Sequence, residues 1–161
     1  MPIVDLLEEY LNNCYQNFLS NGQNLSELEP YASEERFSLS DEALRLPLLI
    51  PSMLRELSKV MRQEATSPRI RAIAGGVYSY VFNPFDYIDE ESLGYLGFLD
   101  DALIVFNGMR FIENMERIKF SSTQDQSLQK MINECETFIN PNLVNELKMY
   151  AENLASMITS Q

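Results

Sequence analysis

The feature that most constrains the fold is a segment rich in acids, glycines and aromatics that lies between two apolar segments. It runs from Asn83 to Asp101 and reads NPFDYIDEESLGYLGFLDD. A solvated linker does not need large aromatic side chains, and a plain core segment does not carry so many carboxylates. The segment is therefore predicted to be a constrained acidic turn that joins two antiparallel helices into a hairpin.

Apolar residues elsewhere recur at intervals of three and four, the spacing of one helix face, and no strand-like alternation of useful length occurs. Helices are expected over 3–19, 52–64, 67–82, 96–120, 124–139 and 141–160. We predict an all-α fold: a single-domain bundle of about six helices over residues 1–161. Its core is a central helical hairpin at about 57–111, joined by the acidic turn and flanked by the N-terminal helix 3–19 and the C-terminal helices 124–160.

Local signals support several of these boundaries. Ser40 and Ser67 are good helix caps, and proline at position 68 suits the first turn of a helix. Pro47 and Pro51 are expected to break or kink the chain that follows Ser40. The pair Gly75-Gly76 in mid-helix costs ~1 kcal/mol per glycine relative to alanine, so a close approach to another helix is expected there.

Two helices carry long apolar patterns that we expect to face the core. In the first, these residues are Ile3, Leu6, Leu7, Tyr10, Leu11, Cys14 and Phe18. In the last, they are Leu143, Leu147, Tyr150, Leu154 and Met157.

Composition excludes several classes of function. The formal net charge is −12, which disfavours nucleic acid as a ligand because phosphate binding needs a basic surface. The chain has no histidine, so the commonest general base is missing, and no phosphate-binding glycine loop occurs. We therefore expect no catalytic residues, no cofactor and no enzyme activity. Cys14 and Cys135 are expected to be reduced thiols of a cytoplasmic protein, since Met1–Asp5 lacks the basic start of a secretory signal.

The charges are unevenly distributed along the chain. Residues 1–42 are strongly acidic and contain Arg36 as their single basic residue, whereas residues 43–71 are mainly basic. One interpretation is that these regions and the acidic turn neutralise one another inside the fold. The other is that an acidic surface stays available to a cationic partner.

Residues from about Leu57 to Phe111 resemble the YkvA-like family, a domain of unknown function found in small bacterial proteins. The resemblance rests on a Pro-x-Asp step followed by Gly-(aromatic)-Leu-Asp-Asp at the start of an apolar helix. The matching residues are Tyr80, Pro84, Asp86, Glu91, Gly94, Gly97, Phe98, Leu99, Asp100 and Asp101, with Pro68, Arg69 and Arg71 upstream. Asp89 departs from the family, which usually has proline there. The family has no established catalytic activity that the resemblance could carry over, and some of its members look membrane-associated.

The carboxylates of the acidic turn allow three interpretations. A hard cation such as Mg²⁺ or Ca²⁺ could be held by oxygen ligands; the candidates are Asp86, Asp89, Glu90, Asp100 and Asp101. Alternatively, Asp86, Asp100 and Asp101 act as caps, and Asp86 or Asp101 forms an ion pair with Arg69 or Arg71. We favour these structural roles over a metal site.

The third interpretation is an exposed contact surface on the same turn. Tyrosines beside acids suit protein interfaces; the predicted partner-binding residues are Asp86, Tyr87, Asp89, Glu90, Glu91 and Tyr95.

The leading functional hypothesis is a non-catalytic protein that binds another protein with a basic surface, using the acidic turn and the N-terminal region. An inhibitor or an immunity or antitoxin-type regulator fits this description. One alternative is a peripheral membrane-associated regulator, in which helices 69–82 and 96–112 or the basic helix 52–71 contact lipid. The other is a metal-binding protein that uses the carboxylates of residues 86–101.

Overall fold

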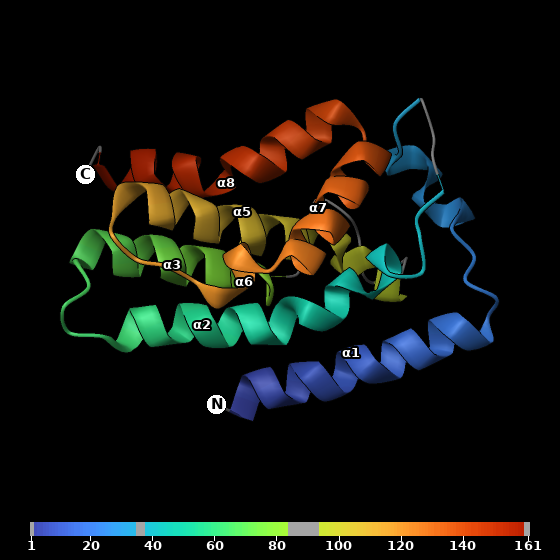
Figure 1. The fold of residues 1–161 in the computed structure, drawn as a ribbon, viewed down its shortest axis with the longest axis horizontal. Coiled ribbons are helices and arrows are strands. Elements are labelled where there is room, and N and C mark those ends of the chain that lie inside the picture. Colours follow the sequence, from blue (N-terminus) through green and yellow to red (C-terminus); the bar gives the residue numbers. More distant parts are fainter. Residues whose placement is uncertain (1, 35–37, 84–93, 160–161) are drawn as a thin grey trace.

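The computed structural model describes the whole chain except residues 1, 35–37, 84–93 and 160–161 (Figure 1). Its longer α-helices are α1 (Pro2–Ser20), α2 (Ile50–Arg62), α3 (Pro68–Tyr80), α5 (Leu99–Met115), α7 (Gln126–Phe138) and α8 (Pro141–Thr159). Shorter turns of helix are η1 (Ser26–Tyr31), η2 (Ala43–Leu49), η3 (Gly94–Phe98) and α6 (Ser121–Gln124). Within the described ranges the only β-type pairing is an isolated bridge between Ala32 and Ile139. The predicted all-α bundle is confirmed.

The helices α2, α3, α5 and α8 lie side by side, and α3 contacts the other three (Figure 1). The helix α1 lies at the edge of the bundle, where it packs against α2, η2 and η3. The predicted hairpin is present, because α3 and α5 pack directly against each other. Its connection, residues 84–93, lies outside the described residues.

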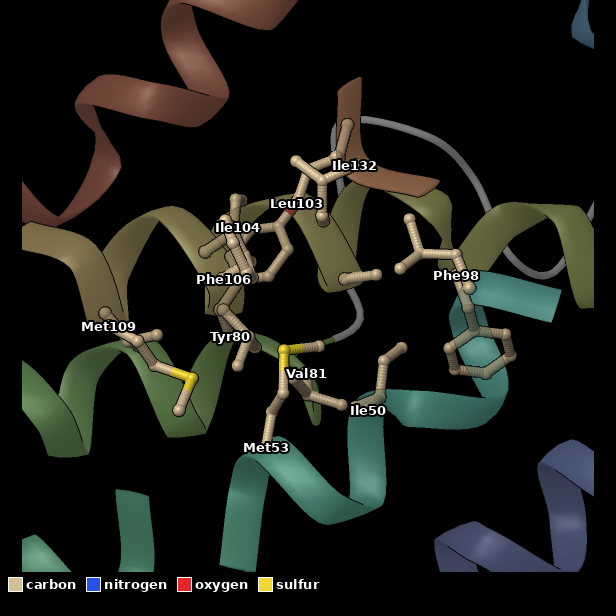
Figure 2. Packing of buried hydrophobic residues seen from close by; sticks show 14 of the residues in the cluster. Ile50, Met53, Tyr80, Val81, Phe98, Leu103, Ile104, Phe106, Met109 and Ile132 are labelled. Carbon is tan, nitrogen blue, oxygen red and sulfur yellow. The ribbon is translucent and has the colours of Figure 1, made fainter. Parts of the chain in front are cut away.

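The core is centred on α5. The predicted core residues Leu99, Leu103, Phe106 and Ile112 are all fully buried. Figure 2 shows side chains from α2, α3, α5 and α7 that meet there; they include Met53, Tyr80, Leu103, Phe106 and Ile132. One continuous apolar cluster therefore joins the hairpin to the C-terminal helices.

Local signals set the start of α3 as predicted. The Ser67 side chain accepts a hydrogen bond from the backbone N–H of Ile70, and Pro68 occupies the first turn. The expected close approach at the glycine pair is also found. A Cβ atom at Gly76 would lie 2.7 Å from Cδ1 of Leu154 on α8. A side chain at this position would therefore meet the neighbouring helix.

The helix boundaries differ from the prediction in two regions of the chain. The expected helix 96–120 begins as the 3₁₀ turn η3, and α5 ends at Met115. The chain then reverses, because the Glu113 carboxylate accepts hydrogen bonds from the backbone N–H of Phe120 at 2.9 Å and from Thr123 Oγ1 at 2.7 Å. After Ser40, whose side chain accepts from the N–H of Ala43, the chain forms the 3₁₀ turn η2 before it continues into α2.

The buried stripe of α8 also differs from the prediction near the C-terminal end of the helix. Met157 is 64% exposed, so its predicted core position is wrong. Small residues take over the buried stripe in the second half of the helix, where Ala151 and Ala155 are 2% and 3% exposed. Alanines let α8 approach α3 and α5 closely, and Met157 falls off this line.

Candidate protein-binding surface

The first turn of α5 is tied to the end of α3 by a buried hydrogen bond. The Tyr80 hydroxyl donates to Oδ2 of Asp100 at 2.6 Å, and the Tyr80 ring packs edge-on against Tyr150 at 5.1 Å between centroids. Asp100 and Asp101 are both 0% exposed. These two carboxylates therefore lie inside the hairpin rather than on a contact surface, and carboxylates at a helix N-terminus favour its dipole.

The predicted ion pair between Arg69 or Arg71 and Asp101 is wrong. Both arginines lie in the first turn of α3, whereas the start of α5 packs near its last turn, about 14 Å further along the helix axis. Arg71 instead donates from Nη2 to the backbone carbonyls of Gln63 and Glu64, both at 2.8 Å. It therefore satisfies carbonyl groups at the C-terminal end of α2.

Five of the predicted partner-binding residues lie outside the described residues: Asp86, Tyr87, Asp89, Glu90 and Glu91. Tyr95 is described, and its prediction as a surface anchor is wrong because it is 3% exposed.

The reason for the burial of Tyr95 is tertiary. Its hydroxyl donates to the carbonyl of Leu44 at 2.6 Å, and the rings of Tyr15 and Phe18 pack against it at 5.0 and 5.5 Å. Burial raises the pKa of Tyr95 well above its ordinary value, with a smaller contribution from Tyr15. Tyr95 is thus the residue through which η3 supports the C-terminal half of α1.

The outer side of α1 carries large apolar side chains in contact with solvent. Ile3, Leu6 and Tyr10 are 43%, 65% and 54% exposed, and their spacing places them on one stripe of the helix. The Tyr10 ring packs edge-on against Phe98 of η3, with centroids 6.1 Å apart. We call Ile3, Leu6 and Tyr10, together with the neighbouring acid Glu9, the α1 face.

The sequence prediction placed Ile3, Leu6 and Tyr10 in the core, and the structure corrects this. Val4, Leu7 and Leu11 form the buried stripe instead. The apolar residues of this helix cover two adjoining stripes, which is wider than a helix at the edge of a bundle can bury. That excess width is the signal that could have indicated a surface.

The charges on α1 are all negative, and one flank of the helix is joined to the basic helix α2. Asp5, Glu8 and Glu9 are its charged residues. Arg55 of α2 contacts Asp5 at 2.8 Å and Glu8 at 3.1 Å. The hydrogen bond from Arg55 lowers the pKa of Asp5 below its ordinary value. The expected neutralisation between the acidic and basic regions is seen at this contact, while Glu9 stays exposed.

A cavity of about 300 Å³ opens where the C-terminal end of α1 meets η3. Its lining residues are Cys14, Asn17, Phe18, Asn21, Asn24, Glu27, Gly94, Tyr95 and Leu96. Helical spacing continues the α1 face directly into this cavity, through positions 14, 17 and 21. We call it the Glu27 cavity, after the one charged residue among the described residues that line it.

Two further observations concern the metal-binding and membrane-associated hypotheses. Across the described ranges, no group of three or more Asp, Glu, Cys or His residues is placed so that it could hold a metal ion. None of the described helices combines the length and the apolar character needed to cross a bilayer.

The described fold and surface define an all-α protein built around a helical hairpin, with an edge helix whose outer side is apolar and acidic. Residues 70–106 match the family described as "Protein of unknown function (DUF1232)". This is the YkvA-like family, so the predicted resemblance is confirmed for α3, η3 and the first half of α5, over a shorter range than 57–111. No solved structure matches the chain.

Proposed function

We propose that this protein binds another protein with a basic surface, and that the α1 face is its contact surface. The observation that carries the proposal is the exposure of Ile3, Leu6 and Tyr10 beside the exposed acid Glu9, on a helix without a basic residue. Apolar anchors with a charged rim are the usual composition of a protein interface. The acidic rim favours a cationic partner and raises the rate of encounter with it.

A protein partner is favoured over a lipid surface by burial and by charge. The helices 69–82 and 96–112, considered for lipid contact, place most of their apolar side chains in the core; Ile73, Val77 and Leu103 are all 0% exposed, and Phe82 at the end of the first is 37% exposed. The apolar residues that remain exposed on α1 are flanked by acids. Anionic lipid would repel this face and the net charge of −12.

The proposed mode of action is non-catalytic. We propose a bacterial, cytoplasmic inhibitor or regulator of the immunity or antitoxin kind, which acts by covering a basic surface of its partner. Glu9 and the net negative charge of the chain supply the charge complementarity, and the apolar residues of the α1 face supply the area that is removed from water. The hairpin supports this surface through the contacts of Tyr95 and Phe98 with α1.

The test compares two pairs of exposed residues during co-purification from the cells that make the protein. The double variant Leu6→Ala with Tyr10→Ala removes the apolar anchors of the α1 face, and Met149→Ala with Met157→Ala removes similarly exposed side chains from α8. We expect the α1 variant to weaken binding of a basic partner by at least about tenfold and the α8 variant to leave it unchanged. Binding should also weaken at high salt.

The proposal is overturned if both variants retain the same partners equally, or if the retained proteins are acidic and insensitive to salt. Circular dichroism on both variants checks that the fold is intact, since all four positions are exposed.

A further inference from the structure

The Glu27 cavity has a consistent electrostatic character. Glu27 lines it and has no hydrogen-bond or ion-pair partner within the part of the chain that the structure describes. The cavity also lies at the C-terminal end of α1, whose last turn contains no basic residue. The negative end of a helix dipole favours a cation. Both features therefore raise the affinity of the cavity for positive charge.

The remaining lining residues suit an organic cation rather than a hydrated metal ion. Phe18 supplies aromatic surface, which attracts ammonium and guanidinium groups, and the buried Tyr95 ring packs against it. The side chains of Asn17 and Asn21 have no intramolecular hydrogen bond among the described residues, so their amide oxygens are available as acceptors. Metal ions such as Mg²⁺ prefer several carboxylate and water oxygens, and the described lining of this cavity offers a single carboxylate.

An anion is disfavoured by the local backbone. The amide N–H groups that follow α1 are already bonded, since Gly22 donates to Leu19 at 3.2 Å and Gln23 donates to Phe18 at 3.1 Å. An anion would therefore find no free backbone donor from these two residues, and it would face the Glu27 carboxylate.

We infer that the Glu27 cavity receives the guanidinium or ammonium group of a basic side chain from the partner protein. The inference rests on the proposed function, because the cavity continues the α1 face along the same side of the helix. Its volume of about 300 Å³ is at the lower end of the range for small-ligand pockets. That volume suits the end of one side chain better than a cofactor.

The chain contains its own reporter for a direct test. Cys14 lines the cavity, whereas Cys135 is 0% exposed. Methanethiosulfonate reagents of similar size, one carrying trimethylammonium and one carrying sulfonate, can therefore compare the access of a cation and of an anion to Cys14. The ratio of the two rates, divided by the ratio for a small free thiol, measures the preference of the cavity. The variant Cys14→Ser identifies any signal from Cys135.

We expect the cationic reagent to be favoured roughly tenfold at Cys14, because attraction and repulsion by one nearby charge each change a rate by a few-fold. Glu27→Gln should lower this preference by about threefold or more. The matched control Glu152→Gln removes an exposed acid from α8, with the same change in net charge, and should leave it unchanged. Equal preferences in the wild type and in Glu27→Gln overturn the inference.

A protection experiment identifies the source of the cation. N-acetylarginine amide at millimolar concentration should slow the modification of Cys14, and its uncharged citrulline counterpart should not. Equal protection by both compounds overturns the inference. Protection by spermidine at micromolar concentration also overturns it, because the site would then bind a free polyamine. The thiol rates do not depend on the partner, so a failed co-purification test would reject the proposed function and leave these results interpretable.

Discussion

The helices α5 and α1 show two ways of using an apolar sequence. In α5, side chains on nearly every side are buried, including the two aspartates of its first turn. In α1, one stripe is buried through Val4, Leu7 and Leu11, while a second stripe faces solvent at Ile3, Leu6 and Tyr10. Both helices are rich in apolar residues, and their neighbours determine the difference.

This comparison separates stability from recognition. α5 contacts helices on several sides, so a change in its side chains changes packing throughout the core. α1 lies at the edge and contacts α2, η2 and η3 along one side. Its outer stripe adds little to the stability of the fold. A role in binding therefore explains best why these exposed residues are apolar.

The largest expected effect compares the centre of α5 with the outer stripe of α1. Phe106→Ala should lower the free energy of unfolding by about 3–5 kcal/mol, because the ring is 0% exposed and its loss leaves a cavity. Leu6→Ala should change it by less than about 0.5 kcal/mol, since this side chain is 65% exposed. Urea denaturation measures both. Equal changes in the free energy of unfolding would contradict the conclusion that α5 stabilises the core and the outer stripe of α1 does not.

The second expected effect concerns the buried thiol of the interior. Burial raises the pKa of Cys135 from 9.0 to about 12, and the S–H group lies 3.9 Å from the carbonyl of Ala43. Between these pH values the unfolded chain releases the proton and the folded chain keeps it. The free energy of unfolding should therefore fall by roughly 1 kcal/mol per pH unit from this group as pH rises above about 9.

The control for this prediction is Cys135→Ala. Because the variant has no thiol at this position, its stability should fall less steeply between pH 9 and pH 11 in denaturant titrations. Parallel pH profiles for the two proteins would show that Cys135 does not resist ionisation in the folded state.

The third prediction compares a glycine of the interior with one nearer the edge. A Cβ atom at Gly108 would lie 2.9 Å from Cγ2 of Val77, which is fully buried and stiff, so Gly108→Ala should destabilise by about 1–2 kcal/mol. At Gly76 the contact is with the end of the half-buried Leu154 side chain, which can rotate away. Gly76→Ala should therefore be neutral or slightly stabilising, because alanine favours the helix. Thermal denaturation of both variants measures the change in stability. A larger loss of stability in Gly76→Ala than in Gly108→Ala would contradict this prediction.

The smallest expected effect concerns the attachment of α1 to α2 by Arg55. In Arg55→Ala, the pKa of Asp5 should return toward its ordinary value, because the hydrogen bond that lowers it is lost. In the wild type, the stabilising contribution of Asp5 is present above its unfolded pKa and is lost as pH falls through the lowered folded pKa. Carboxyl NMR titration measures both values. The same Asp5 pKa in both proteins would show that the contact does not persist in solution.

Much of the interior could be predicted from the sequence. The buried faces of α3 and α5 follow from helical spacing, because a helix enclosed on both sides must place its apolar residues toward its neighbours. The start of α3 followed from Ser67 and Pro68, since capping and proline geometry are local. The family resemblance also came from a local pattern around Tyr80 and Asp100.

The features that the sequence analysis missed depend on contacts between residues that are distant in the sequence. Tyr95 is buried because its hydroxyl meets the carbonyl of Leu44, and Arg71 binds carbonyls at the end of another helix. The end of α5 depends on Glu113 meeting the backbone of Phe120 after the chain has turned. The outward stripe of α1 was missed for the same reason: periodicity shows that residues share a face but not which face is left uncovered.

The hairpin has a consequence for how the chain can be divided. Residues before position 84 and after position 93 contact each other at several places, through α3 with α5 and α8, α1 with η3, and η2 with α7. The hydrogen bonds from Tyr80 to Asp100 and from Tyr95 to Leu44 also join the two parts. Two separately produced halves, 1–83 and 94–161, should therefore reassemble without a covalent link, which offers a split reporter whose signal depends on an intact bundle.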